Sequence, residues 1–456
     1  MTANYWNEIE ILKARYDIPF EAIVKSDLLR LGVHFTPEAL QYAKAFKEKS
    51  YFIFSFDRVT QNELSDEEKH AAPEEMALMG GPYDFKKTIV SVRLNPLSPY
   101  RVEVVSGACQ TKDLHALKTD RADRLLSATP PTQLALVHTN KKINENICFI
   151  SLLERPAYYQ KTLSNGKPVS DITPTIEWGY LIYLTAFRIC QYWGAKEECA
   201  FCDINENYRQ QKKERSYTAI KPIDEVIEAL TLIQETDTAR VSRAYTVSGG
   251  SIITDLNGKS EADFYAQYAE AIEKKFPGRW IGKANVQALP KEDVKKLKGA
   301  GYQIYHPNLE IWDEKLFKNI CPGKERYVGQ GEWIKRVVDA AEIFGAQHVI
   351  PNFVAGIEMS KPHGFQTVNE AVASTTQGFD FFMSKGIVPR FTVWCVEPNT
   401  TLAQTNTEPP PLEYFVALLQ NYRDTFRKYK LPTPPGYGEP GLGKAVFSVS
   451  AFMDVL

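Results

Sequence analysis

The sequence predicts an α/β protein in which six strand–helix units form a partial (β/α)6 barrel of the TIM type. From about residue 171, apolar runs of strand length alternate with amphipathic helical segments. Such alternation implies a parallel sheet with right-handed crossovers, and six units fall short of the eight that close a full barrel. Residues 1–170 lack this alternation and predict a mixed α/β accessory domain that caps the barrel. Residues 171–405 are expected to form the barrel, and residues 406–456 a C-terminal helix and tail packed on it.

The composition is that of an ordinary globular protein and indicates no general electrostatic affinity for nucleic acids or membranes. The 456 residues suffice for two domains, and a formal charge of -2 without long runs of one sign gives no support for a nucleic-acid or membrane-surface role. The first residues lack the basic-then-apolar layout of a signal peptide. The longest apolar stretch, residues 180–187, is too short to span a bilayer. We therefore expect a cytoplasmic protein.

The N-terminal part combines helical and strand-like patterns. Apolar residues between Ile9 and Leu28 recur at helical spacing, and Thr36-Pro37 is typical of an N-cap followed by proline at the first helical position. Strand-like runs are predicted at residues 51–56, 88–94, 100–105, 133–137 and 147–152. The function of this part is not indicated by its sequence.

The barrel elements follow in order. Strands are predicted at residues 180–189, 243–247, 280–286, 302–306, 348–354 and 387–396, and helices at 223–233, 264–272, 291–297, 333–344, 368–383 and 412–429. Parallel barrels carry their chemistry at the carboxyl ends of the strands. Polar and glycine-rich segments follow each predicted strand. This end of the barrel is therefore the expected site.

Three of the seven cysteines, Cys190, Cys199 and Cys202, cluster directly after the first predicted barrel strand. Three thiolates can hold three irons of a [4Fe–4S] cluster and leave the fourth iron open. A structural zinc would want a fourth Cys or His, and no histidine lies between His138 and His306. Three unrelated buried thiols are the remaining alternative. Cys109, Cys148 and Cys321 do not form a second ligand cluster by their spacing.

The Cys190-x8-Cys199-x2-Cys202 motif, with Phe201 between the last two cysteines, resembles the cluster motif of the radical S-adenosylmethionine (radical SAM) superfamily. The resemblance covers roughly residues 176–405 and is of the biotin synthase-like kind. The usual first gap is three residues, whereas this one has eight. The resemblance implies one [4Fe–4S] cluster and S-adenosylmethionine as cofactors, and an external electron donor such as flavodoxin or ferredoxin. It also implies a 5′-deoxyadenosyl radical that abstracts hydrogen from a small organic substrate in a biosynthetic pathway.

Further segments match the superfamily in the expected order. The Ser248-Gly249-Gly250-Ser251 segment is similar to the Gly-Gly-Glu segment that presents backbone carbonyls to the methionine amino group, with Ser251 in place of Glu. A plain turn is its structural alternative. The segment from Tyr305 to Glu310 resembles one whose amide and acid bind the ribose hydroxyls, here Asn308 and Glu310. A helix cap before Asp313 is the alternative there.

Two later segments complete the resemblance. The segment Phe353-Val354-Ala355-Gly356-Ile357-Glu358 is similar to the apolar segment that backs the adenine, although Phe353 and Val354 could equally be barrel core. Residues 397–402 resemble a loop common in the superfamily, without its glycine. The arginine that binds the methionine carboxylate in the biotin synthase-like branch aligns with Trp333. Arg243, Lys283 and Arg336 remain open as substitutes.

A few further residues are candidates by position. Asn285 and Gln287 end the third barrel strand and are expected at the barrel mouth, to contact S-adenosylmethionine, substrate or the loop itself. Cys395 could act as a radical relay or a sulfur source, or be a buried apolar cysteine, and His306 could hold substrate. Tyr192 and Trp193 could shield the cluster or contact a reductant. A non-catalytic iron–sulfur carrier and a zinc-binding scaffold are the other functional classes left open.

Overall fold

A computed structural model describes residues 5–50, 56–105, 133–140, 143–194, 196–214 and 218–456. Most of the strand expected at 51–56, and both Cys109 and His115, lie outside the described residues. Helix α1 (Tyr5–Arg15) precedes α2 (Phe20–Leu31), in place of one continuous helical pattern. The Thr36 side chain accepts a hydrogen bond from the backbone N–H of Ala39 at 3.2 Å, and thereby caps α3 (Pro37–Ala43) as predicted.

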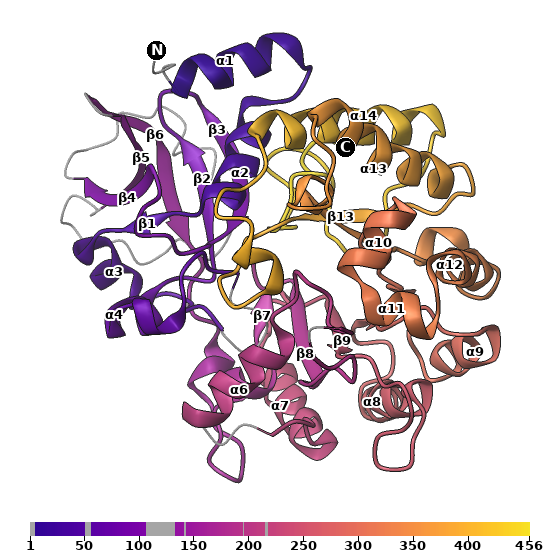
Figure 1. The fold of residues 1–456 in the computed structure, drawn as a ribbon. Helices are drawn as coiled ribbons and strands as arrows, with labels where there is room; N and C mark the ends of the chain where they lie inside the picture. Colours follow the sequence, from indigo (N-terminus) through magenta and orange to yellow (C-terminus); the bar gives the residue numbers. More distant parts are fainter. Residues whose placement is uncertain (1–4, 51–55, 106–132, 141–142, 195, 215–217) are drawn as a thin grey trace.

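The N-terminal part is built on a six-stranded sheet of order β1-β4-β5-β6-β2-β3. Its strands are β1 (His34–Phe35), β2 (Glu75–Gly80), β3 (Phe85–Ser91), β4 (Tyr100–Val105), β5 (Gln133–Asn140) and β6 (Ile143–Leu152). All neighbouring pairs are antiparallel except the parallel pair β1–β4. Helices α2, α3 and α4 (Asp66–Ala71) accompany this sheet (Figure 1). Strands β3 to β6 occur close to their predicted positions, whereas β2 was not predicted.

Six parallel strands follow, as the sequence predicts. They are β8 (Leu181–Phe187), β9 (Ala244–Gly249), β10 (Ile281–Asn285), β11 (Ile304–Tyr305), β12 (Asn352–Ala355) and β13 (Arg390–Val393). Strands β8 to β11 form one sheet with the antiparallel β7 (Thr175–Ile176) at its edge, and β12 pairs with β13. Parallel bridges Tyr305↔Val349 and Glu310↔Phe353 join the two sheets into one curved surface. The expected α/β fold with a partial barrel is therefore confirmed.

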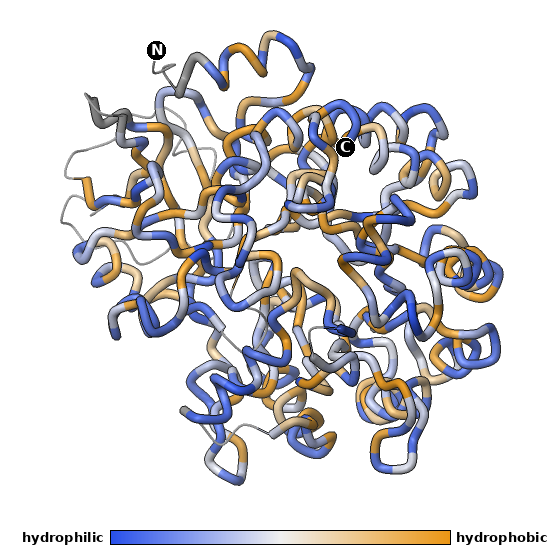
Figure 2. The backbone as a smooth tube through the Cα atoms, in the orientation of Figure 1, coloured by the Kyte–Doolittle hydropathy of each residue, from blue (hydrophilic) through white to orange (hydrophobic). Residues whose placement is uncertain are grey.

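Helices cover the outside of these strands (Figure 1). They are α7 (Ile223–Thr236), α8 (Glu261–Lys275), α9 (Lys291–Gly299), α12 (Gln330–Phe344), α13 (Val368–Met383) and α14 (Leu412–Lys428). Each sits where the sequence predicts a helix, because its apolar residues recur at helical spacing and pack on the sheet. Figure 2 shows hydrophobic residues alternating with hydrophilic ones along these outer helices. No helix of the described ranges is both long and apolar enough to cross a bilayer.

Smaller helices shape the ends of the barrel. Helices α5 (Val169–Ile172) and α6 (Ile204–Glu214) flank β8 in the sequence, and α6 directly follows the three clustered cysteines. Helices α10 (Glu314–Ile320) and α11 (Pro322–Tyr327) are inserted between β11 and α12. Asp313 accepts a hydrogen bond from the N–H of Leu316 at 2.8 Å and so caps α10.

The C-terminal tail joins the barrel to the N-terminal sheet. Val393 at the end of β13 donates a backbone hydrogen bond to Val449 at 3.0 Å, and Ser91 of β3 donates one to Ser448 at 3.0 Å. Farther along, Lys25 of α2 forms an ion pair with Asp454 at 2.7 Å, and both side chains are fully buried. The tail therefore packs across both parts of the chain.

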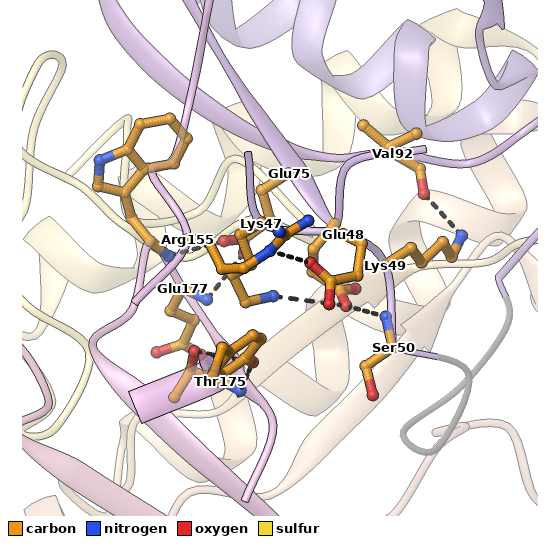
Figure 3. A network of polar contacts seen from close by, with 12 residues as sticks. Lys47, Glu48, Lys49, Ser50, Glu75, Val92, Arg155, Thr175 and Glu177 are labelled. Atoms are coloured by element: carbon orange, nitrogen blue, oxygen red, sulfur yellow. Dashed lines mark hydrogen bonds and ion pairs between the residues drawn. The ribbon is translucent and has the colours of Figure 1, made fainter. Parts of the chain in front are cut away.

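A second contact between the two parts rests on one buried carboxylate of β2. Glu75 accepts hydrogen bonds from the backbone N–H groups of Glu177 at 2.8 Å and Trp178 at 2.7 Å, just before β8 begins. Figure 3 shows this contact with Lys47 and Arg155 nearby. Burial raises the pKa of Glu75 to about 7. This side chain links the N-terminal sheet directly to the first barrel strand.

Candidate functional site

A cavity of ≈ 240 Å³ lies within the barrel and opens at the carboxyl ends of its strands. Most residues predicted for the site line it. These are Cys190, Cys199, Phe201, Cys202, Ser248, Gly249, Gly250, Asn285, Gln287, Asn308, Glu310, Val354 and Cys395. The structure therefore brings together residues that are up to 205 positions apart, from Cys190 to Cys395.

The cysteine loop, residues 190–202, is held by backbone and side-chain hydrogen bonds. The N–H of Cys190 donates to Asn205 Oδ1 at 2.8 Å, and the N–H of Cys202 donates to the carbonyl of Cys199 at 2.9 Å. Gly250 packs directly beneath the start of this loop. A Cβ atom there would lie 2.1 Å from the carbonyl oxygen of Ile189, so only glycine fits. The Gly-Gly segment thus supports the first cysteine as well as lining the cavity.

The three cysteines are half-buried and line the same cavity. Burial raises the pKa of Cys190 to about 12, and raises that of Cys202 well above its usual value. The pKa of Cys199 is also raised, first by a hydrogen bond with the Cys321 thiol and then by burial. Cys321 caps the end of α10 and was not expected beside the triplet. Thiolates at these positions would therefore need the positive charge of bound metal.

The donor set fits a [4Fe–4S] cluster. Each of three irons takes one thiolate, so the three sulfurs need only line a common cavity and need not converge on one ion. In the part of the chain that the structure describes, no three His, Cys, Asp or Glu side chains are arranged around a single metal ion. The three cysteines share one cavity wall with the glycine segment and with Phe201.

A chain of hydrogen bonds crosses four neighbouring strands at the cavity. Tyr183 Oη donates to Ser248 Oγ at 3.4 Å, and Asn285 Nδ2 donates to the same oxygen at 3.0 Å. Asn308 Nδ2 in turn donates to Asn285 Oδ1 at 3.0 Å. The Asn308 Oδ1 atom is buried without a partner among the described residues. It is an acceptor that a bound ligand can satisfy.

A buried ion pair borders the same part of the cavity. Lys324 Nζ lies 2.7 Å from Glu310 Oε1, donates to the carbonyl of Asn308 at 2.8 Å, and sits 4.5 Å from the centre of the Trp333 ring. Burial alone would lower the pKa of Lys324, but the Glu310 carboxylate raises it above its usual value. The pair fixes the Asn308–Glu310 segment, in which Glu310 has a φ of 76°.

Two basic residues of the cavity, Lys324 and Arg390, were not predicted from the sequence. Lys324 lies on the short inserted helix α11, outside any predicted element. Arg390 was detectable as the one charged residue inside the apolar run of the sixth strand. The three proposed substitutes do not line the cavity. Arg243 is exposed, Lys283 is buried against the carbonyl of Gly436, and Arg336 contacts the carbonyl of Ala288.

Two other predicted site residues lie behind the cavity wall. Phe353 is fully buried and packs on Phe379 and Phe382, so it belongs to the core, while its neighbour Val354 lines the cavity. His306 is buried with its Nδ1 2.9 Å from the carbonyl oxygen of Ile350, and is not among the lining residues. Burial lowers the pKa of His306 well below its usual value.

The N-terminal part reaches the cavity through Phe56. Its N–H donates to Glu397 Oε1 at 2.8 Å, and Cys395 Sγ donates to its carbonyl at 3.0 Å. Phe56, Cys395 and Glu397 all line the cavity. Cys395 therefore lines the cavity, as a radical relay would have to, but its thiol already donates a hydrogen bond to Phe56. Burial raises its pKa to about 12.

The aromatic residues of the cysteine loop differ in exposure. Tyr192 is buried, lines the cavity and donates from Oη to Gln287 Oε1 at 3.0 Å. Its ring stacks on Tyr327 of α11 at 5.7 Å, and the Tyr327 side chain is partly exposed. Trp193 is 51% exposed and lies under the Arg209 guanidinium. Tyr192 thus belongs to the cavity wall and Trp193 to the surface.

Comparison with known proteins finds distant relatives. No protein-family model matches the chain. It is 21% identical over 274 residues to the bacteriochlorophyllide c C-7(1)-hydroxylase of Chlorobaculum limnaeum. That match covers 59% of this chain and 65% of the relative, so the chain spans just under two thirds of the relative's length.

Solved structures similar to the chain include methylornithine synthase (PylB) and the coproporphyrinogen III oxidase HemN from Escherichia coli, which is described as a radical SAM enzyme. PylB is 11% identical with a TM-score of 0.38, covering 53% of this chain and 62% of its own. HemN is 13% identical with a TM-score of 0.32, covering 55% and 52%.

Proposed function

We propose that this protein is a radical SAM enzyme that binds one [4Fe–4S] cluster through Cys190, Cys199 and Cys202. When bound, the cluster and S-adenosylmethionine supply a 5′-deoxyadenosyl radical by one-electron reductive cleavage. The radical abstracts hydrogen from a small organic substrate in a biosynthetic pathway. An external donor such as flavodoxin or ferredoxin delivers the electron, and the reaction takes place in the cytoplasm.

One observation carries the proposal. The three cysteines, the Gly249–Gly250 backbone and the Asn308–Glu310 segment line a single cavity at the carboxyl ends of parallel strands. These residues come from the loops after three different strands. Parallel barrels place catalytic and binding groups at this end because every strand delivers its following loop there. The order of the segments along the chain also matches the resemblance drawn from the motifs.

The residues of the cavity divide the binding of S-adenosylmethionine between them. The Ser248–Gly250 backbone accepts the methionine amino group, and Asn308 with Glu310 accepts the ribose hydroxyls. Both acceptors suit a diol, since a carboxylate and a free amide oxygen can each take an O–H donor. Phe201 and Val354 supply apolar surface for the adenine. Lys324 holds Glu310 in place and offsets its charge.

The N-terminal part, predicted as an accessory domain, has a role in closing the site. Phe56 enters the cavity wall from that part and is fixed by contacts with Cys395 and Glu397. Exclusion of water protects a reactive radical from side reactions. We therefore assign to the N-terminal part the task of covering the cavity and confining the substrate.

Anaerobic reconstitution with iron and sulfide, followed by dithionite and S-adenosylmethionine, tests the proposal. We expect four irons per chain and formation of 5′-deoxyadenosine and methionine, measured by mass spectrometry. A reconstituted protein that forms neither product would be an iron–sulfur carrier instead. Recovery of zinc alone would indicate a scaffold.

A matched set of variants tests the ligand assignment. Cys190→Ala, Cys199→Ala and Cys202→Ala should each lose most of the brown cluster absorbance. Cys321→Ala should keep it, because Cys321 contacts Cys199 but is not assigned as a ligand. Equal loss of iron in Cys321→Ala would contradict the three-ligand assignment.

A further inference from the structure

The inner end of the cavity contains a cationic side chain. Arg390 begins β13 and lines the cavity with Thr392 of the same strand, and the three residues from Val393 to Cys395 line it as well. At about 3.3 Å per residue of extended chain, Arg390 lies roughly 13 Å deeper than Trp394, which follows β13. Arg390 therefore marks the floor of the cavity, away from the cysteines at its mouth.

The charge of Arg390 has no carboxylate partner. Its Nη1 donates to Tyr437 Oη at 3.0 Å, but none of the ion pairs within the described ranges includes Arg390. Its Nε is buried without an acceptor among the described residues. A guanidinium held in this way retains N–H donors for a planar anion, and arginine binds carboxylates through two parallel hydrogen bonds.

The other charged and titratable groups around Arg390 lie behind the cavity wall. Glu177 interacts with Arg390, Lys283 and Lys25, and burial raises its pKa. Burial lowers the pKa of Lys283, and lowers that of His306 well below its usual value. Glu177, Lys283 and His306 are not among the lining residues, so Arg390 is the group of this set that an anion in the cavity can reach.

Further unsatisfied polar atoms lie beside Arg390 on β12 and just after the end of β13. Asn352, the register partner of Arg390 on β12, is 4% exposed, and its Oδ1 has no partner within the described part of the chain. The indole N–H of Trp394, a residue 2% exposed, likewise lacks an acceptor there. Buried polar groups without partners are costly unless a ligand satisfies them.

We propose that the substrate is an organic acid whose carboxylate binds Arg390 at the floor of the cavity, with Asn352 contacting a polar group beside it and Trp394 contacting a polar group nearer the mouth. This inference rests on the proposed function, because it places the carboxylate at the inner end and the carbon to be attacked nearer the mouth. Arg390 and Asn352 are then substrate-binding residues.

Matched acid and amide probes test this proposal without knowledge of the substrate. Binding of butanoate, hexanoate and benzoate, and of the corresponding amides, is measured by calorimetry on the reconstituted protein with S-adenosylmethionine. We expect at least one acid to bind about tenfold or more tightly than its amide. Absence of acid binding, or equal affinity for acid and amide, would overturn the proposal.

Variants of Arg390 and Asn352 test whether acid binding depends on the charge at the floor of the cavity or only on an intact fold. Arg390→Gln should abolish the preference for the acid, Arg390→Lys should keep part of it, and Asn352→Asp should weaken acid binding about tenfold while leaving the amide unaffected. Arg243→Gln removes the same charge from an exposed position and should change nothing. An acid preference that survives in Arg390→Gln and Asn352→Asp would show that the carboxylate binds elsewhere.

Failure of this inference is distinct from failure of the proposed function. Substrate-free cleavage of S-adenosylmethionine by the wild-type protein under dithionite tests the proposed function alone, so cleavage together with equal affinity for acid and amide would overturn only this inference. Loss of cleavage in Arg390→Gln with a normal iron content would instead place the methionine carboxylate on Arg390, and would overturn the assignment to substrate.

Discussion

At the residue scale, the Lys324–Glu310 ion pair holds the Asn308–Glu310 segment in place at the cavity. Both side chains are about nine-tenths buried, and Lys324 also holds the carbonyl of Asn308. A buried pair contributes modestly to stability as a whole, but removing one partner leaves an uncompensated charge. The pair is therefore better understood as a positioning device than as a source of stability.

Lys324→Met should destabilise the protein by about 3–5 kcal/mol, because Glu310 would be left buried without its counter-charge. Urea unfolding measures this change. The double variant Lys324→Met/Glu310→Gln should recover most of the lost stability, since no unpaired charge remains. Affinity for S-adenosylmethionine should stay at least tenfold reduced in both variants. Recovery of affinity in the double variant would argue against a role for this segment in binding.

The residues of the site differ in how far sequence can predict them. Cysteines at short spacing and paired glycines carry a local pattern, and the structure places both at the cavity. Lys324 has no such pattern, because it reaches the cavity only through the inserted helices α10 and α11. Phe353 and Val354 are adjacent, and only the packing of Phe353 on Phe379 shows which one faces inward. Such choices depend on contacts between distant elements.

At the element scale, the cysteine loop and the β9 glycine segment form one tightly packed unit. Gly250→Ala would place a Cβ 2.1 Å from the carbonyl oxygen of Ile189 and 2.3 Å from the Cα of Cys190. Overpacking of this kind costs about 1–3 kcal/mol. We expect lower stability and reduced iron after reconstitution, measured by thermal unfolding and iron analysis.

Gly299→Ala is the matched control for this substitution. Gly299 ends α9, and a Cβ there would meet no atom within 4 Å. Alanine in a helix is favoured over glycine by about 0.5–1 kcal/mol. Iron content should therefore stay normal and stability should be equal or slightly higher. A similar iron loss in both variants would mean that the effect does not come from the cysteine loop.

The Glu75 contact between β2 and the start of β8 predicts a pH dependence. Its pKa of about 7 in the folded protein exceeds the ordinary 4.5, so between these values the folded state holds a proton that the unfolded state releases. The stability from this group therefore falls as pH rises from about 4.5 to about 7. The full difference corresponds to about 3 kcal/mol.

Comparison with Glu75→Gln isolates this dependence, because the amide does not titrate. Free energies of unfolding are measured for both proteins at pH 5 and pH 8. Relative to wild type, the variant should gain about 2.5 kcal/mol between the two values, because a small part of the difference lies below pH 5. A constant difference across this range would show that Glu75 is already ionised at pH 5 in the folded protein.

Helices and strands are predicted correctly where burial requires apolar residues in a simple, regular pattern. The six parallel strands are mostly buried and lie within apolar runs, so β8 to β13 occur where the sequence predicts them. Strand β2 was missed because it begins with the buried Glu75 and ends in glycine, which weakens the apolar pattern. Its carboxylate is buried only because backbone N–H groups of a distant segment satisfy it.

At the scale of the whole molecule, the C-terminal tail makes the stability of the two parts interdependent. Asp454→Asn would leave Lys25 buried without its counter-charge, at a cost of about 3–5 kcal/mol. Hydrogen exchange should show faster opening in both α2 and β13, because the tail contacts both. Faster exchange in α2 alone would contradict this coupling.

The exposed ion pair of Arg15 with Glu413 provides the control for this prediction. Glu413→Gln removes a charge from the surface, where an ion pair contributes about 0–1 kcal/mol. Its exchange pattern should match that of the wild type. Comparison of the exchange rates of Asp454→Asn and Glu413→Gln shows whether the effect depends on the burial of the ion pair or on the loss of any ion pair.

The stacked rings of Tyr192 and Tyr327 have a consequence for electron delivery. Tyr192 lines the cavity together with the three cysteines, and Tyr327 is exposed to solvent, so these two stacked rings connect the surface with the proposed cluster site. A reductant that docks over Tyr327 can transfer its electron through this contact while the cavity stays closed around its contents. Reduction would then not require the cavity to open, so the order of reduction and substrate binding need not be fixed.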